Sequence, residues 1–260
     1  MTEAKRSRGQ SVRFPRHRRI VLDLCEAART VPAFAVDRPI DLTRVMNARR
    51  STPQRIGWAA IFAKAYALVA AESPALRQTF VSYPWPRLYQ HPDSVVSIAV
   101  NRFDPELDGE RLSWINVRAV DSLTLAEIQD AIDSHQQGDS PEKLREQQRV
   151  ETMPLPLRRL AWHILMRWAG RRRAKVLGTF SLSTLASYGT TNHSHPLVVT
   201  TSLSYGPLDE EGCSLVTLQA DHRVLDGAAA ARALVRLDEV LRGEIVEELF
   251  GLHRGVRRAA

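Results

Sequence analysis

The sequence is poor in cysteine and has no long apolar run. Its 260 residues include two cysteines, Cys25 and Cys213, which are far apart and lack metal-ligand spacing. The longest apolar runs, such as 58–62 and 197–199, are much shorter than the about 20 residues of a membrane-spanning helix. The amino terminus has no apolar core of a secretion signal. Two thiols without such a signal are typical of a reducing compartment, so we expect a cytoplasmic protein in which each thiol is a small buried residue.

Nucleic-acid-binding motifs are also missing, although the chain is basic. Lys and Arg number 36 against 29 Asp and Glu, a net charge of +7. The excess lies in residues 1–19, 158–173 and 254–258, without zinc-finger spacing, an RNA-binding aromatic motif or a basic-zipper heptad. We interpret this charge as solvated tails and a solvated helix face, and we expect no nucleic acid partner. The positive charge is also compatible with an anionic substrate or an anionic membrane surface.

What the chain does have is the composition of a globular protein. Hydrophobic residues make up 44% and charged residues 25%, and this length can form one large core. No internal repeat divides the sequence. We expect a basic, disordered tail at 1–17, one domain at 18–250 and a basic tail at 251–260.

Hydrophobic periodicity predicts an alternation of helices and strands. The period of 3.6 predicts helices over 18–29, 56–72, 122–134, 157–173 and 227–241, with a short helix opening at 41–43. Runs rich in strand-forming residues predict strands over 31–37, 94–102, 113–120, 179–182, 197–205 and 214–220. Residues 135–153 are polar and are expected to form a loop with a short helical turn. This order predicts an α/β fold with a mixed sheet.

The segment 157–173 combines an apolar stripe with many arginines. The stripe recurs at helical spacing and consists of Leu157, Leu160, Ala161, Ile164, Leu165 and Trp168. A helix that packs on the sheet and turns its arginines to water gives this pattern, and we favour that interpretation. A helix that lies on a membrane surface or an anionic partner gives the same pattern.

The segment Asp221-His222-Arg223-Val224-Leu225-Asp226-Gly227 carries the clearest chemistry. A histidine at the end of a strand can be held rigidly and can deprotonate a hydroxyl or thiol that attacks an acyl group. Asp226 can brace the turn, and Gly227 permits a tight start of the next helix. His-x-x-x-Asp-Gly is short enough to arise by chance, so spacing alone favours a structural role for His222.

The sequence DHRVLDGA, followed by an Ala-rich helix, resembles the signature of the 2-oxo acid dehydrogenase acyltransferase catalytic domain. That family belongs to the chloramphenicol acetyltransferase-like superfamily. The resemblance implies that His222 is the general base and that Asp226 mainly braces the catalytic turn, with Arg18 as its salt-bridge partner. The Asp221-His222 pair favours this branch over condensation domains, which more often have His-His.

A second segment, GTFSLSTLASYG at 178–189, is similar to the family's Gly-Thr-Phe-Thr-Ile-Ser-Asn-Leu-Gly. The family serine aligns with Ser183 rather than Ser181, which implies that Ser183 donates a hydrogen bond to the oxyanion of the tetrahedral intermediate. Taken alone, Ser183 would be one polar residue in a Ser/Thr-rich turn. The two motifs together, in the expected order, favour the catalytic interpretation.

The resemblance extends over about 18–134 and 176–249, with departures that bear on the substrate. Only a short basic tail precedes Arg18, so we expect no swinging lipoyl arm. The strand ERLSWINVRAV lacks the family's Gly and Pro, and the insert at 135–175 is long and basic. Lipoamide is therefore doubtful as the acyl donor, whereas coenzyme A or another pantetheine carrier suits a basic chain. No covalently bound cofactor is expected, and no metal, because His193 and His195 lack a third ligand.

We therefore expect a chloramphenicol acetyltransferase-like two-layer sandwich that acts as an acyltransferase. The resemblance implies a homotrimer with each active site between neighbours, His222 from one subunit and Ser183 from the next. One alternative is a non-catalytic trimeric scaffold, against which the retention of both residues argues. The other is a membrane-surface protein that uses the helix 157–173.

Overall fold

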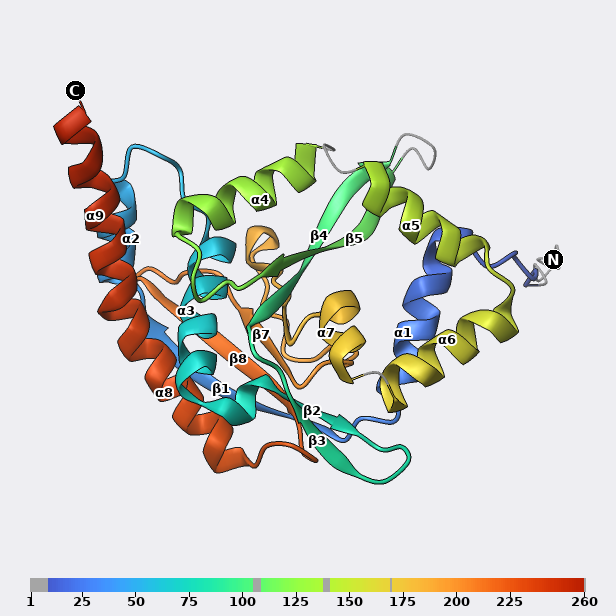
Figure 1. Ribbon diagram of the computed structural model, residues 1–260. Helices are drawn as coiled ribbons and strands as arrows, with labels where there is room; N and C mark the ends of the chain where they lie inside the picture. Colours follow the sequence, from blue (N-terminus) through green and yellow to red (C-terminus); the bar gives the residue numbers. More distant parts are fainter. Residues whose placement is uncertain (1–8, 105–108, 138–140, 169, 260) are drawn as a thin grey trace, which may run out of the picture.

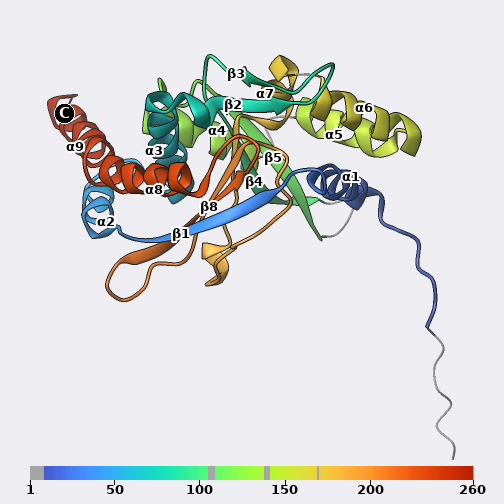
Figure 2. The same ribbon diagram turned by 90° about the horizontal axis from the view of Figure 1, so that it is seen from below.

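The computed structural model describes residues 9–104, 109–137, 141–168 and 170–259. Its core consists of a six-stranded sheet and the helices that pack on one face of it, and further helices lie at the opposite face (Figure 1 and Figure 2). The sheet strands are β1 (Ala33–Asp41), β4 (Val95–Asp104), β5 (Gly109–Arg118), β6 (Phe180–Leu182), β7 (Thr201–Tyr205) and β8 (Cys213–Asp221); β2 (Gln78–Val81) and β3 (Arg87–Gln90) form a separate hairpin. The helices are α1 (Arg19–Ala28), α2 (Thr43–Arg50), α3 (Trp58–Glu72), α4 (Leu125–Gln137), α5 (Pro141–Thr152), α6 (Leu155–Arg167), α7 (Gly170–Leu177), α8 (Gly227–Arg242) and α9 (Glu244–Ala259).

The sheet is mixed, as expected. Its strand order is β1-β8-β7-β6-β4-β5, and β6 runs parallel to both of its neighbours while the other pairs are antiparallel. The short β6 is therefore the element that joins the β4–β5 hairpin to the rest of the sheet. The predicted α/β two-layer sandwich is confirmed.

Helix α3 lies at the centre of the core, as its Ala-rich sequence predicts. Its side chains are buried on most sides, and Tyr66 is fully buried. The Tyr66 hydroxyl donates to Thr201 Oγ1 at 2.9 Å, which satisfies a buried polar group and ties α3 to β7. The sheet and the helix layer thus share one continuous core.

Two expected boundaries were wrong. Residues 141–152 form α5 rather than a loop; Pro141 is favourable at a helix start, and the buried ion pair between Glu151 and Arg111 helps to attach this polar helix. Residues 197–199 are buried but unpaired, so β7 begins only at Thr201. Helix α9 continues from the domain into the expected basic tail, and Ile245, Val246 and Leu249 pack its first half onto the core.

The segment 157–173 does not form one helix that turns its stripe to the sheet. It is divided between α6 and α7, and α6 is rotated so that Arg158 is buried. Because successive residues are about 100° apart, the inward face lies roughly a quarter turn from the expected stripe. The stripe is partly exposed instead, with exposed fractions of 54% for Leu157, 54% for Leu160 and 46% for Ile164.

Helix α7 begins against the β2–β3 hairpin. Gly170 lies against β3, where an added Cβ would be 2.7 Å from Tyr89 Cγ. Arg173, one turn later, is also buried, and its guanidinium donates to Val198 O and Phe80 O. The favoured interpretation, in which all arginines of this segment face water, was therefore wrong.

Two further expectations concern the termini and the thiols. Of the expected tail, residues 1–8 lie outside the described part of the chain, and 9–15 form no helix or strand. Cys25 is exposed and Cys213 partly buried, so the prediction of two buried thiols was wrong. No helix within the described ranges is both long and apolar enough to cross a membrane.

Candidate active site

Ser183 lies directly after β6, at the point where that strand ends. The motif preceding it anchors the strand: Gly178 has φ +84° and lies so close to β4 that a Cβ would be 2.8 Å from Val95 O. Thr179 Oγ1 accepts from Val95 N at 2.9 Å and donates to Val95 O. Glycine and threonine of the GTF motif thus fix β6 against β4, and with it the position of Ser183.

The structure distinguishes Ser183 from the neighbouring Ser181. Ser181 Oγ donates to Ser202 Oγ at 2.6 Å, so its hydroxyl is already engaged. Ser183 N donates to Leu203 O at 3.1 Å, whereas its Oγ has no partner among the described residues. Of the two hydroxyls, that of Ser183 is therefore the one available to a ligand.

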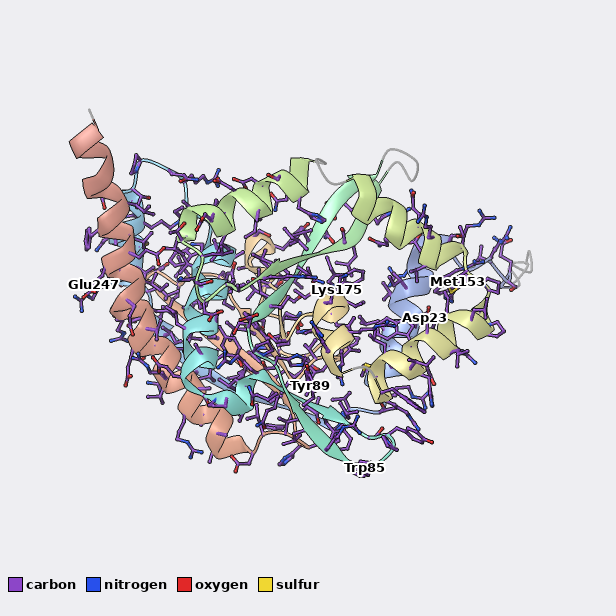
Figure 3. All side chains as sticks on the ribbon, viewed as in Figure 1. Asp23, Trp85, Tyr89, Met153, Lys175 and Glu247 are labelled. Atoms are coloured by element: carbon purple, nitrogen blue, oxygen red, sulfur yellow. The ribbon has the colours of Figure 1, made fainter. Side chains whose placement is uncertain are left out.

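A cavity of about 510 Å³ opens beside Ser183. Residues of strands β4, β5 and β6 and of helices α1, α5, α6 and α7 line it. Figure 3 shows Asp23 between α1 and α6, and Met153 at the link between α5 and α6. The side chains around it are mainly apolar, and Trp114 and Trp162 are among them.

His195 also lines this cavity. Its Nε2 lies 2.7 Å from Ser202 Oγ, so His195, Ser202 and Ser181 form a continuous polar string beside Ser183. Burial lowers the pKa of His195, which favours the neutral imidazole. His193 lies elsewhere, 3.4 Å from Asp37. Within the described residues, no three His, Cys, Asp or Glu side chains are placed to hold a metal ion.

His222 lies at the opposite end of the sheet, directly after β8. Its backbone N–H donates to Pro32 O at 2.9 Å, and its exposed ring packs on Phe34 at 4.8 Å between centroids. The preceding Asp221 is buried and forms a two-pronged ion pair with Arg223, at 2.9 and 2.7 Å. This pair fixes the turn on which the His222 ring is presented.

Asp226 caps the helix that follows the turn. Its Oδ1 accepts from Ala229 N at 2.7 Å, which satisfies one of the free N–H groups at the start of α8. The expected pair with Arg18 does not form in the described structure. Arg223 donates to Thr30 O, so it is the carboxyl end of α1 that lies near the turn, whereas Arg18 precedes the amino end.

Ser183 and His222 are not brought together within one chain. Leu182 pairs with Leu203, and Thr201 pairs with Ala220, so Ser183 and His222 differ by five residues along the strand direction. At about 3.3 Å per residue and about 4.8 Å for each of two strand spacings, their backbones are roughly 19 Å apart. The two side chains of one chain therefore cannot contact the same carbonyl carbon.

The contacts of the insert were not predicted from sequence. Arg158 donates to Asp23 through Nε at 2.6 Å and Nη2 at 3.2 Å, with both side chains almost fully buried. Arg111 and Glu151 form a second buried pair, at 2.8 Å. The charged residues at these positions gave no sequence signal, because each partner lies on a distant segment.

Comparisons with known proteins agree with this fold. Residues 8–152 match the family described as 2-oxoacid dehydrogenases acyltransferase (catalytic domain). The match ends before Ser183 and His222. A search of curated proteins finds no match.

Solved structures resemble the chain over nearly its whole length. A probable dihydrolipoamide acetyltransferase from Listeria monocytogenes is 16% identical, with a TM-score of 0.64 over 93% of this chain and 95% of its own. The cubic core of a pyruvate dehydrogenase multienzyme complex is 20% identical, with a TM-score of 0.63 over 92% and 94%. The Azotobacter vinelandii dihydrolipoamide acetyltransferase is also 20% identical, with a TM-score of 0.64 over 92% and 94%.

These structures establish the fold, and the family match spans more than half of the sequence. The protein therefore belongs to the 2-oxoacid dehydrogenase acyltransferase family, through its catalytic domain, and is an acyltransferase.

Proposed function

We propose that this acyltransferase moves an acyl group between coenzyme A, or a similar pantetheine thioester, and a thiol or hydroxyl acceptor. His222 is the general base, Ser183 is the oxyanion donor and Asp226 holds the catalytic turn. The active site lies between neighbouring subunits of a homotrimer. The chain's net charge of +7 favours an anionic carrier such as coenzyme A, and its unpaired thiols favour the cytoplasm.

The observation that carries this proposal is the separation of the two side chains. Ser183 presents a free hydroxyl beside a cavity, and His222 presents an exposed ring at another part of the sheet. Two chains can supply both groups to one carbonyl, whereas one chain cannot. A relative studied for the roles of a serine, a histidine and an asparagine in catalysis supports these roles. Its asparagine follows the histidine by four positions, as Asp226 follows His222.

In the proposed mechanism, a ring nitrogen of His222 takes the proton from the acceptor thiol or hydroxyl. The acceptor atom forms a bond to the thioester carbonyl carbon, and the carbonyl electron pair moves onto oxygen. The Ser183 hydroxyl donates to that oxyanion, a contribution worth about 3 kcal/mol at comparable sites. When the intermediate collapses, the carbon–sulfur bond breaks and the leaving thiolate takes the proton back from His222.

Mixed oligomers test both the residues and the subunit boundary. We expect His222→Ala and Ser183→Ala each to reduce acyl transfer by about 100-fold or more while the oligomer stays intact. When the two variants are co-expressed, random assembly gives about a quarter of the interfaces a native histidine and a native serine. Activity of the co-expressed mixture should therefore rise to about a quarter of the wild-type value.

Co-expression of His222→Ala with itself is the matched control and should restore nothing. An inactive mixture that nevertheless forms mixed oligomers, shown by native mass spectrometry, would contradict a site shared between subunits. Near-normal activity of His222→Ala alone would contradict its role as the base.

A membrane-surface role is a second candidate, because the apolar stripe of α6 is exposed. The hairpin β2–β3 adds Trp85 and Leu88, with exposed fractions of 66% and 46%, and Tyr83 stacks on Trp168 at 3.9 Å between centroids. Exposed arginines, Arg87, Arg159 and Arg167, flank these apolar residues. Aromatic and aliphatic side chains beside arginines are typical of contacts with anionic lipid headgroups.

A further inference from the structure

The cavity beside Ser183 is larger than a short acyl group requires. Its volume is about 510 Å³, and one water molecule occupies only about 30 Å³ in the liquid. An acetyl group would leave most of this space empty. A cavity of this size is in the range that accommodates a substantial organic ligand.

The inserted helices give the cavity its apolar character. Trp162 and Leu165 of α6 line it together with Ile20 and Leu24 of α1. Met153 adds to the wall from the link between α5 and α6. The cavity is thus lined largely by apolar side chains that do not participate in the proposed chemistry.

Among the described residues that line the cavity, Arg158 is the one cation, and it is already neutralised. Arg158 directs Nε and Nη2 to the carboxylate of Asp23, and Nη1 to Met153 O at 3.4 Å. Both side chains of the pair are 4% exposed or less. A free carboxylate at the end of an acyl group would find no available positive charge here, so an uncharged chain fits better.

The uncharged polar side chains among the described lining residues, Ser97, Ser181, Ser183 and His195, are neighbours: Ser97 pairs with Ser181 in the sheet, and Ser202 links Ser181 to His195. This polarity orients a thioester, with its carbonyl at Ser183 and its hydrocarbon chain toward α6. The amides of a pantetheine arm would lose their hydrogen bonds in the apolar part. The arm therefore extends away from the cavity, and the acyl chain enters it.

We propose that this cavity binds the aliphatic acyl chain of the thioester, with a medium length of roughly six to twelve carbons. The inference rests on the proposed function for the placement of the carbonyl at Ser183. Binding of the chain itself depends on the wall residues rather than on His222. Each buried methylene strengthens binding by about fourfold, which favours longer chains until the cavity is full.

Binding to the inactive His222→Ala protein separates this inference from the catalytic proposal. Acetyl-, octanoyl- and dodecanoyl-coenzyme A are titrated while the fluorescence of Trp114 and Trp162, which line the cavity, is recorded. We expect octanoyl-coenzyme A to bind at least about 50-fold more tightly than acetyl-coenzyme A. Equal affinities for all three thioesters would overturn the inference, whatever the transfer assay shows.

A pair of substitutions on one helix locates the chain. Leu165→Trp fills the cavity and should weaken octanoyl-coenzyme A binding by at least about 10-fold. Leu160→Trp introduces the same side chain on the exposed face of α6 and should leave binding unchanged. Circular dichroism and thermal unfolding identify any variant that fails to fold, and Leu165→Phe then replaces Leu165→Trp. Equal effects of the inward and outward substitutions would overturn the assignment to this cavity.

Discussion

At the scale of single residues, polar groups rather than apolar ones set the local geometry of the site. Asp221 and Arg223 fix the turn that presents His222, and Thr179 fixes the strand that presents Ser183. Both motifs were predicted from sequence because their residues are contiguous. The prediction that Arg18 pairs with Asp226 was wrong, since Arg18 belongs to another segment whose placement depends on the whole fold.

A buried histidine outside the site makes the stability of the protein depend on pH. His91 is 3% exposed, and its Nε2 lies 3.0 Å from Thr79 Oγ1. Burial, with a smaller effect of Arg173, lowers the pKa of His91 to about 4. An unfolded chain has the ordinary histidine pKa of about 6.5, so it takes up a proton first as the pH falls.

We predict that His91 reduces the free energy of unfolding on acidification. The loss begins below about pH 6.5, increases as the pH falls and reaches about 3 kcal/mol near pH 4. The measurement is urea unfolding of the wild type and of His91→Gln from pH 7.5 to 4. The variant should show the shallower pH dependence. Parallel curves for the two proteins would contradict the prediction, because they would show that His91 takes up protons equally in the folded and the unfolded state.

At the scale of elements, the inserted helices are attached by buried ion pairs. Arg158 of α6 pairs with Asp23 of α1, and Arg111 of β5 pairs with Glu151 of α5. Removal of one partner from a buried pair leaves an uncompensated charge. The position of α6 therefore depends on charges that a hydrophobic-pattern analysis places in water.

We predict that Arg158→Met reduces the free energy of unfolding by about 3–5 kcal/mol, because Asp23 then stays buried without a partner. The double variant Asp23→Leu/Arg158→Met should recover most of this loss, since neither charge remains. Guanidinium unfolding of the two single variants and the double variant measures the coupling. A double variant as unstable as the sum of the single variants would show that the pair is not coupled.

The elements that were predicted correctly are those with a simple internal pattern. Helices α3 and α8 and the strands β4, β5 and β8 have apolar residues whose spacing follows from the shared core. Helix α5 was not predicted because it is polar. The predicted inward face of α6 was wrong because Arg158 rather than Leu157 is buried. Sequence periodicity identifies the apolar face of a helix, but it does not show whether a buried ion pair turns another face toward the core.

At the scale of the whole molecule, the exposed face of α6 makes membrane binding testable. We predict that the protein co-sediments with vesicles of phosphatidylcholine and phosphatidylserine in low salt, and less with phosphatidylcholine alone. Leu160→Gln/Ile164→Gln should weaken this binding, because both side chains are exposed. The control Val12→Gln alters an exposed apolar residue outside α6 and should leave it unchanged. If Leu160→Gln/Ile164→Gln weakens co-sedimentation no more than Val12→Gln does, a membrane role of this helix is contradicted.

The cavity wall and the two side chains proposed to be catalytic belong to separate segments of the chain. Ser183 is fixed by β4 and β6, and His222 by β1 and β8, whereas the width of the cavity depends on α5 and α6. If the cavity binds the acyl chain as proposed, a change of side-chain volume at its lining positions between Val150 and Leu165 alters which chain lengths are accepted without displacing Ser183 or His222. Substrate range and chemical step can evolve independently in such an arrangement.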